Sequence, residues 1–172
     1  MNFLDIAKTR FYVRNYAAQK VEQDKLNQIL QAARVAPTAA NLQPVRLIVV
    51  QQEEGLQKIG KSANIYKAPL AIIVCVDTEK TWKRPFDGKL ETDTDASILT
   101  DHMMLQATEL GLGSVWVDYF KPDVLKEEFA LPDKIEPVHI LVLGYANETP
   151  ANPERHTQTR IPMEDLVYYE HL

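Results

Sequence analysis

Two arginines and a tyrosine near the start of the chain are spaced to face the same way. Arg10, Tyr12 and Arg14 occupy alternate positions, and an extended segment puts alternate side chains on one face. A guanidinium group binds two phosphate oxygens at once, so this pattern suits a phosphate ester. Two solvated arginines around a core aromatic would give the same pattern, and residues 9–14 taken alone favour that simpler interpretation.

A turn bounded by two prolines is the second candidate site. It carries small side chains and then two amides, in the order Pro37, Thr38, Ala39, Ala40, Asn41, Leu42, Gln43 and Pro44. Small side chains let the backbone approach a flat ligand, and amides can donate and accept hydrogen bonds along the polar edge of a heterocycle. The prolines make the turn rigid, which lowers the ordering cost of binding. For the turn alone, a loop capped by Asn41 is an equally good interpretation.

No other residues suggest a nucleophile, a triad or a metal site. Cys75 lies in the apolar run 70–76, which indicates a buried strand thiol. The histidines lack the spacing of metal ligands, and we expect His102 and His139 to be satisfied core residues. Asp93 and Asp95 are interpreted as charges at a helix start. We therefore predict no catalytic side chain and no metal.

The apolar pattern predicts a single α+β domain over residues 1–172. Helices are expected at 3–8, 21–35, 53–61, 95–110 and 122–129, and strands at 45–50, 70–76, 114–117 and 138–143. The second half of helix 95–110 is apolar almost all round, so we expect it to be central and buried. A Rossmann domain is disfavoured because no glycine-rich loop follows the first strand. Residues 78–91 are expected to form a lid-like excursion, and residues 146–172 a C-terminal extension.

Composition narrows the possible functions. The chain has 172 residues, 45% of them hydrophobic and 25% charged, as in ordinary globular proteins. Its net charge of −5 argues against a general nucleic-acid binder. A single cysteine cannot form an internal disulfide, and the longest apolar run is far short of the ~20 residues that span a bilayer. We expect a soluble protein of the cytoplasm that binds neither nucleic acid nor membrane.

Four motifs in order resemble the nitroreductase family. They are Arg10, Tyr12 and Arg14; then Ala32-Ala33, Ala36-Pro37-Thr38, Asn41 and Gln43-Pro44; then Asp95-Ala96, Leu105, Ala107, Leu110 to Ser114 and Trp116; and finally Leu143-Gly-Tyr145 with Arg160-Ile-Pro-Met-Glu-Asp165. The resemblance extends from about residue 3 to residue 168. It implies a three-layer sandwich, with a central, mostly antiparallel sheet flanked by helices, and a homodimer with FMN at the subunit interface.

The resemblance also implies roles for individual residues. Arg10, Tyr12 and Arg160 would hold the FMN phosphate and ribityl chain, with Phe11 in the same segment, while Arg14 would face the pyrimidine side of the flavin. The partner subunit would line the ring with Pro37, Thr38, Ala39, Asn41 and Gln43.

The implied activity is an FMN-dependent transfer of hydride from NADH or NADPH to a small acceptor such as a nitroaromatic or a quinone. The flavin would perform the chemistry in a ping-pong cycle, so no catalytic side chain is needed. Three aromatic or basic residues of the excursion, Trp82, Arg84 and Phe86, either roof the flavin or simply pack a surface loop. A non-catalytic FMN carrier, a flavin-consuming relative and an interaction protein without cofactor are the alternatives.

Overall fold

The fold is built on a four-stranded antiparallel sheet. The computed structural model describes residues 2–172. In spatial order the strands are β1 (Val45–Val50), β2 (Leu70–Asp77), β4 (Ile135–Gly144) and β3 (Gly113–Val117). Each neighbouring pair is antiparallel. The predicted α+β class is confirmed.

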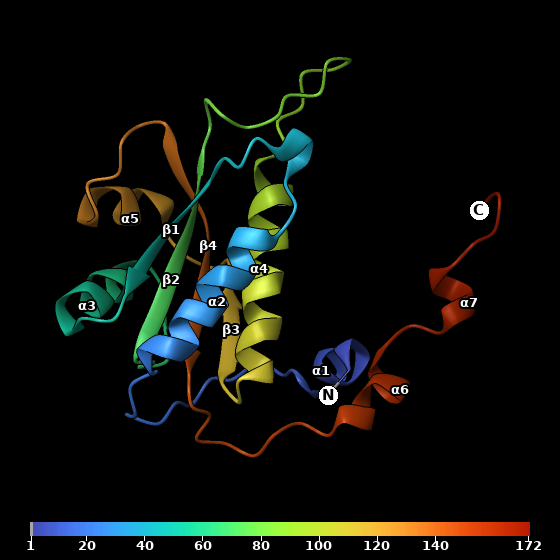
Figure 1. The fold of residues 1–172 in the computed structure, drawn as a ribbon, viewed down its shortest axis with the longest axis horizontal. Helices are drawn as coiled ribbons and strands as arrows, with labels where there is room; N and C mark the ends of the chain where they lie inside the picture. Colours follow the sequence, from blue (N-terminus) through green and yellow to red (C-terminus); the bar gives the residue numbers. More distant parts are fainter. Residues whose placement is uncertain (1) are drawn as a thin grey trace.

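Helices cover both faces of this sheet and make three layers (Figure 1). On one face lie α2 (Gln23–Val35) and α4 (Thr92–Glu109), and on the other lie α3 (Glu53–Ser62) and α5 (Pro122–Glu128). All the predicted helices and strands are present, with ends shifted by a few residues. The expected three-layer sandwich is therefore correct.

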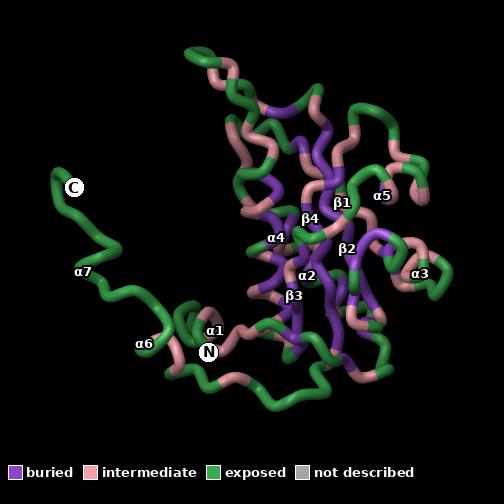
Figure 2. Tube along the Cα trace, turned by 180° about the vertical axis from the view of Figure 1, so that it is seen from behind, coloured by how far each residue is buried: buried purple, intermediate pink, exposed green. Residues whose placement is uncertain are grey.

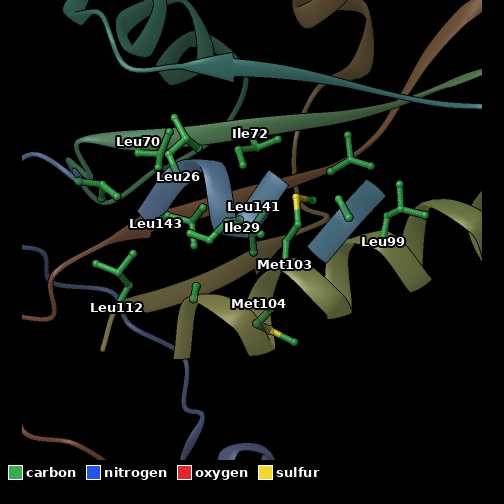
Figure 3. Close-up of a cluster of buried hydrophobic side chains, with 14 of the residues drawn as sticks. Leu26, Ile29, Leu70, Ile72, Leu99, Met103, Met104, Leu112, Leu141 and Leu143 are labelled. Carbon is green, nitrogen blue, oxygen red and sulfur yellow. The ribbon is translucent and has the colours of Figure 1, made fainter. Parts of the chain in front are cut away.

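The central strand β2 explains why its sequence is apolar without alternation. Ile72 belongs to the core beneath α2 and α4, whereas Ile73 belongs to the core beneath α3 and α5. All eight residues of the strand are buried, as Figure 2 shows for the middle of the sheet. Figure 3 shows the first of these cores, in which Met103 of α4 and Ile29 of α2 lie against the strands. A strand covered on both faces needs no polar side.

Two predictions about these elements need correction. β4 begins at Ile135, three residues before the predicted start, because the pairing with β2 continues past an irregularity at Val138, opposite Val74 and Cys75, and includes Pro137. The second half of α4 is buried on one side only. Met103 and Met104 are buried, but Leu105 is half-exposed, since α2 and the sheet cover a single face of the helix.

The N-terminal helix and the segment that follows β4 lie beside each other at one edge of the molecule (Figure 1). The first helix is α1 (Phe3–Thr9), and a capping box between Asn2 and Asp5 begins it. After β4 the chain continues through η2 (Pro153–Arg155), α6 (His156–Thr159) and α7 (Met163–Leu166). From residue 161 on, it stands away from the body as an exposed arm (Figures 1 and 2). Within residues 2–172, no helix combines the length and the apolar character required to cross a membrane.

Burial of Cys75 generates a prediction about thiol reactivity. The side chain is fully buried in β2, and burial, helped by the charge of Glu136, raises the pKa of its thiol from 9.0 to about 12. At pH 8 the folded chain should therefore hold about a thousandfold less thiolate than the unfolded chain. We expect Ellman's reagent to leave the native protein unlabelled and to react with one thiol in guanidinium chloride. Rapid labelling of the native protein would contradict the burial.

Candidate functional site

The segment 10–14 lies alongside the edge strand β3. Tyr12 forms a parallel bridge with Ser114, and the Val13 N–H donates a hydrogen bond to the Ser114 carbonyl at 3.0 Å. Gly113 makes this approach possible, because a Cβ atom there would lie only 2.4 Å from Val13 Cγ2. The predicted extended conformation is thus held in place by the sheet.

The alternating pattern in this segment gives the expected common face. Val13 is fully buried, whereas Tyr12 is half-exposed on the opposite side. The guanidinium carbons of Arg10 and Arg14 lie 4.9 and 5.9 Å from the centre of the Tyr12 ring. Two cations and a hydroxyl therefore gather on one side, which favours the anion-binding interpretation over two scattered surface arginines.

Residues from the end of the chain complete this region. The guanidinium group of Arg155 donates hydrogen bonds to the carbonyl oxygens of Lys8 and Arg10. Further along, the Asn147 N–H donates to the Asn15 carbonyl at 2.8 Å. These contacts join residues more than 130 positions apart in the sequence, so the N-terminal segment is fixed on both sides.

A cavity of about 320 Å³, the arginine cavity, opens between the N-terminal segment and the segment that follows β4. It is lined by Arg10, Phe11, Tyr12, Ala151, Arg155, His156, Thr159 and Arg160. The structure thus brings together Arg10, Tyr12 and Arg160, which the resemblance had placed around one phosphate. Arg155 and His156 were missed. Their only signal was a cluster of basic residues shortly before Arg160.

One buried atom shows that this cavity suits an anion. Arg10 Nη1 is buried, and it has no hydrogen-bond partner among residues 2–172. A buried guanidinium nitrogen without an acceptor is costly, and a phosphate oxygen would satisfy it. The cavity residues therefore fit the phosphate end of a nucleotide-like cofactor.

The proline-bounded turn adopts an unusual backbone. It contains η1 (Ala39–Asn41), and Ala40, Asn41 and Gln43 have φ angles of 50°, 55° and 52°. This left-handed region is unfavourable for residues other than glycine, least so for asparagine, and such strain clusters at functional sites. Thr38 Oγ1 stabilises the turn by accepting a hydrogen bond from the Gln43 N–H at 3.1 Å.

Asp95 anchors the turn to the first part of α4. Its side chain is fully buried, and Oδ1 accepts a hydrogen bond from the Ala39 N–H at 2.8 Å. It does lie in the first turn of α4, as expected. The interpretation as a simple helix-start charge was nevertheless incomplete, because the carboxylate holds a loop 56 residues earlier. The sequence feature that could have indicated this anchoring role is the Asp95-Ala96 pair of the third motif.

The structure does not bring the turn and the arginine cavity together within one chain. The turn is held at Asp95, near the start of α4. Arg10 lines a second, smaller cavity with Gly111 and Gly113, which follow the end of the same helix. From Asp95 to Glu109 the helix rises by about 21 Å. One helix therefore separates the two candidate parts of the site.

A serine, a histidine and an aspartate lie in line elsewhere, an arrangement that residue spacing did not reveal. His139 Nδ1 is 2.6 Å from Asp118 Oδ1 and His139 Nε2 is 3.1 Å from Ser97 Oγ. Trp116 Nε1 donates to the same Asp118 oxygen at 2.8 Å. Both ring nitrogens of the buried His139 are satisfied, which confirms it as a core histidine. The hydrogen bonds of Ser97, His139 and Asp118 connect α4 to the loop after β3, and we assign them a structural role.

The excursion at residues 78–91 is a hairpin that projects beyond the sheet (Figure 1). Lys83 pairs with Leu90, and Arg84 forms a two-point ion pair with Asp87. At its tip the Phe86 side chain is 96% exposed. An exposed aromatic on a braced hairpin is compatible with a lid, and that role stays a prediction.

Comparison with known proteins identifies the family of this chain. The chain matches the model of the nitroreductase family over residues 7–65 and 60–145. It is similar to a nitroreductase family protein of Clostridium difficile 630, with 59% identity, a TM-score of 0.98 and complete coverage of both chains. An FMN-dependent nitroreductase of Clostridium difficile R20291 is 29% identical, with a TM-score of 0.80, over 98% of this chain and 99% of that one. An FMN reductase [NAD(P)H] of Bacillus subtilis is 29% identical over 92% of this chain and 69% of its own length.

The anchoring by Asp95 generates a prediction about the turn. Replacing Asp95 with alanine should lower the free energy of unfolding by about 1–3 kcal/mol, because the Ala39 N–H loses its acceptor and a cavity remains. Urea denaturation followed by circular dichroism measures this. Asp93→Ala is the matched control, since Asp93 is exposed in the same helical turn, and it should change the stability by less than about 0.5 kcal/mol. Equal losses in the two variants would refute the anchoring role.

Proposed function

Since this chain belongs to the nitroreductase family, we propose that it works as a homodimer, binds FMN between its subunits and reduces a small oxidised acceptor. It is an NAD(P)H-dependent oxidoreductase by family and by relatives named for NAD(P)H and FMN. Nitroaromatics and quinones are the acceptors that we propose. A cytoplasmic location is part of the proposal, because reduced nicotinamide nucleotides are available there.

The observation that carries the proposal is the buried, unsatisfied Nη1 atom of Arg10, a residue of the arginine cavity. Arg160 lines this cavity from the C-terminal side, and Tyr12 from the N-terminal side. A scaffold protein would gain nothing from a buried guanidinium nitrogen without an acceptor among the described residues. A phosphate would remove that cost, so the alternative of an interaction protein without cofactor is disfavoured.

The residues act by binding and orientation. Arg10 and Arg160 would neutralise the phosphate, and the strained turn at residues 38–43 would hold the flat ring through its backbone and amides. When bound, FMN supplies the redox chemistry, taking two electrons and a hydrogen from the nicotinamide and delivering them to the acceptor. Arg14 would favour negative charge on the pyrimidine side. Overall, NAD(P)H, a proton and the oxidised acceptor yield NAD(P)⁺ and the acceptor with two added hydrogens, in a ping-pong order.

The length of α4 is the argument for a homodimer. The arginine cavity and the turn lie toward opposite ends of this helix, which rises by about 21 Å from Asp95 to Glu109. A single flavin can contact both only if the turn comes from a second chain. The exposed arm supports the same conclusion, because several of its large apolar side chains are more than half exposed in one chain: Ile161, Met163, Leu166, Tyr168, Tyr169 and Leu172.

Replacing Arg10 with alanine tests the phosphate assignment. Loss of one charged hydrogen-bond donor should raise the dissociation constant for FMN about 10- to 100-fold. Quenching of flavin fluorescence during titration of the apoprotein measures it. Lys58→Ala is the control, because it removes one positive charge from α3, where Lys58 pairs with Glu54. Unchanged FMN affinity in the Arg10 variant would show that the assignment is wrong.

Electron transfer is tested anaerobically with the same protein. The wild type should bleach with NADH or NADPH and recover its yellow colour on addition of nitrofurazone or menadione. Bound FMN that does not bleach would favour the alternative of a non-catalytic carrier, and steady loss of the flavin itself would favour a flavin-consuming enzyme.

Light scattering after size-exclusion chromatography tests the assembly. We expect a mass of twice the 19.6 kDa of the chain for the FMN-bound protein. A monomer that retains FMN at micromolar concentration would contradict a site shared by two subunits.

A further inference from the structure

We propose that a cationic cavity beside the proline-bounded turn binds the phosphates of the nicotinamide donor. This inference rests on the proposed function and assigns part of the donor's binding to particular residues. The cavity has a volume of about 510 Å³ and lies between the end of α2, the turn, β1 and the base of the hairpin. Its cations are Arg34, Arg46 and Lys80.

All the charged side chains that line this cavity are positive. None of the described residues that line it is acidic. Elsewhere on the surface, lysines sit against carboxylates, as Lys58 does with Glu54 at 3.0 Å and Lys134 with Glu79 at 3.2 Å. Arg34 and Arg46 have no carboxylate partner within the described residues, and Lys80 has one at 3.7 Å, Asp77. Three cations around one hollow, in a chain of net charge −5, indicate an anionic ligand.

The three cations have few partners. Arg46 Nη1 donates to the backbone carbonyls of Gln43 and Val45 at 3.0 and 2.8 Å. Lys80 Nζ lies 3.7 Å from Asp77 Oδ2, a distant ion pair. Arg34 makes no hydrogen bond or ion pair within the described part of the chain. Donor groups of all three side chains thus remain available for phosphate oxygens.

Apolar side chains also line the cavity, which narrows the class of ligand. They are Leu30, Ala33, Leu47 and Leu99. Inorganic phosphate or a simple sugar phosphate would leave this surface uncovered. A dinucleotide offers both parts that the cavity can bind, a flat ring system and a pyrophosphate.

The position of the cavity agrees with the geometry of hydride transfer. Thr38 and Gln43 line it, and they also belong to the turn that we propose against the flavin ring. The nicotinamide must stack on that ring, so the donor's phosphates need positive charge next to the ring site and not within it. The arginine cavity at the far end of α4 is left for the phosphate of FMN.

The experiment compares the wild type with the double variant Arg34→Ala/Lys80→Ala. Arg46 is left in place because its hydrogen bonds hold the turn. Both proteins are assayed with NADH, with NADPH and with N-benzyl-1,4-dihydronicotinamide, a donor that has the ring but no phosphate. We expect KM for NADH and NADPH to rise by about tenfold or more, as expected for losing charged phosphate contacts. The kcat/KM for the benzyl donor and the affinity for FMN should stay unchanged.

Three results would overturn the inference, and a fourth bears on the proposed function alone. Unchanged KM for NADH and NADPH would show that the cations do not bind the donor. An equal loss with the benzyl donor would show that they act at the ring. Weaker FMN binding would assign the cavity to the cofactor. If the wild type oxidises none of the three donors, the proposed function fails before the cavity is tested. Lys58→Ala serves again as the charge control.

Discussion

The close contact between the N-terminal segment and the edge of the sheet is the constraint on which the site depends. Gly113 lets the backbone at Val13 approach β3, and Arg155 fixes the same segment from its other side through backbone carbonyls. Both supports come from distant parts of the sequence, so the position of the segment depends on the sheet and on the region after β4. The fold thereby forces a cation, Arg10, into a position where part of it is buried without an acceptor in the described chain. A ligand that supplies the missing acceptor would remove this cost.

A second constraint follows from α4, which acts as a rigid spacer. One of its ends carries Asp95, which fixes the strained turn, and the other leads to Gly111 beside the arginine cavity. Under the proposed function, α4 keeps the two parts of the site apart in one chain. Two chains in antiparallel arrangement would bring unlike parts together twice, which is the symmetry of an isologous dimer.

Sequence alone predicted the layers of the fold and the common face of the N-terminal segment, and the features that it missed have physical reasons. The alternation of Arg10, Tyr12 and Arg14 was sufficient to predict that their side chains share one face, because side-chain direction in an extended segment depends only on local geometry. The left-handed turn at Ala40 was not predictable from residue type, since alanine disfavours that conformation. The anchor Asp95 and the clamp Arg155 were missed for another reason. Their partners lie 56 and more than 140 residues away in the sequence. Helix and strand periodicities relate only residues that are close in sequence, so they could not predict these contacts.

The distribution of charge connects the two cavities. With a net charge of −5, the chain as a whole repels nucleotides, which are themselves anionic. Screening limits that repulsion to about 8 Å at physiological salt, so cations at close range decide whether a nucleotide binds. The chain keeps such cations in the arginine cavity, around Arg10 and Arg160, and beside the turn, around Arg34 and Lys80. In a dimer, the first group of one subunit and the second group of the other would flank a single ring site. A cofactor and its electron donor would then approach that site from opposite sides, each held by its own phosphates.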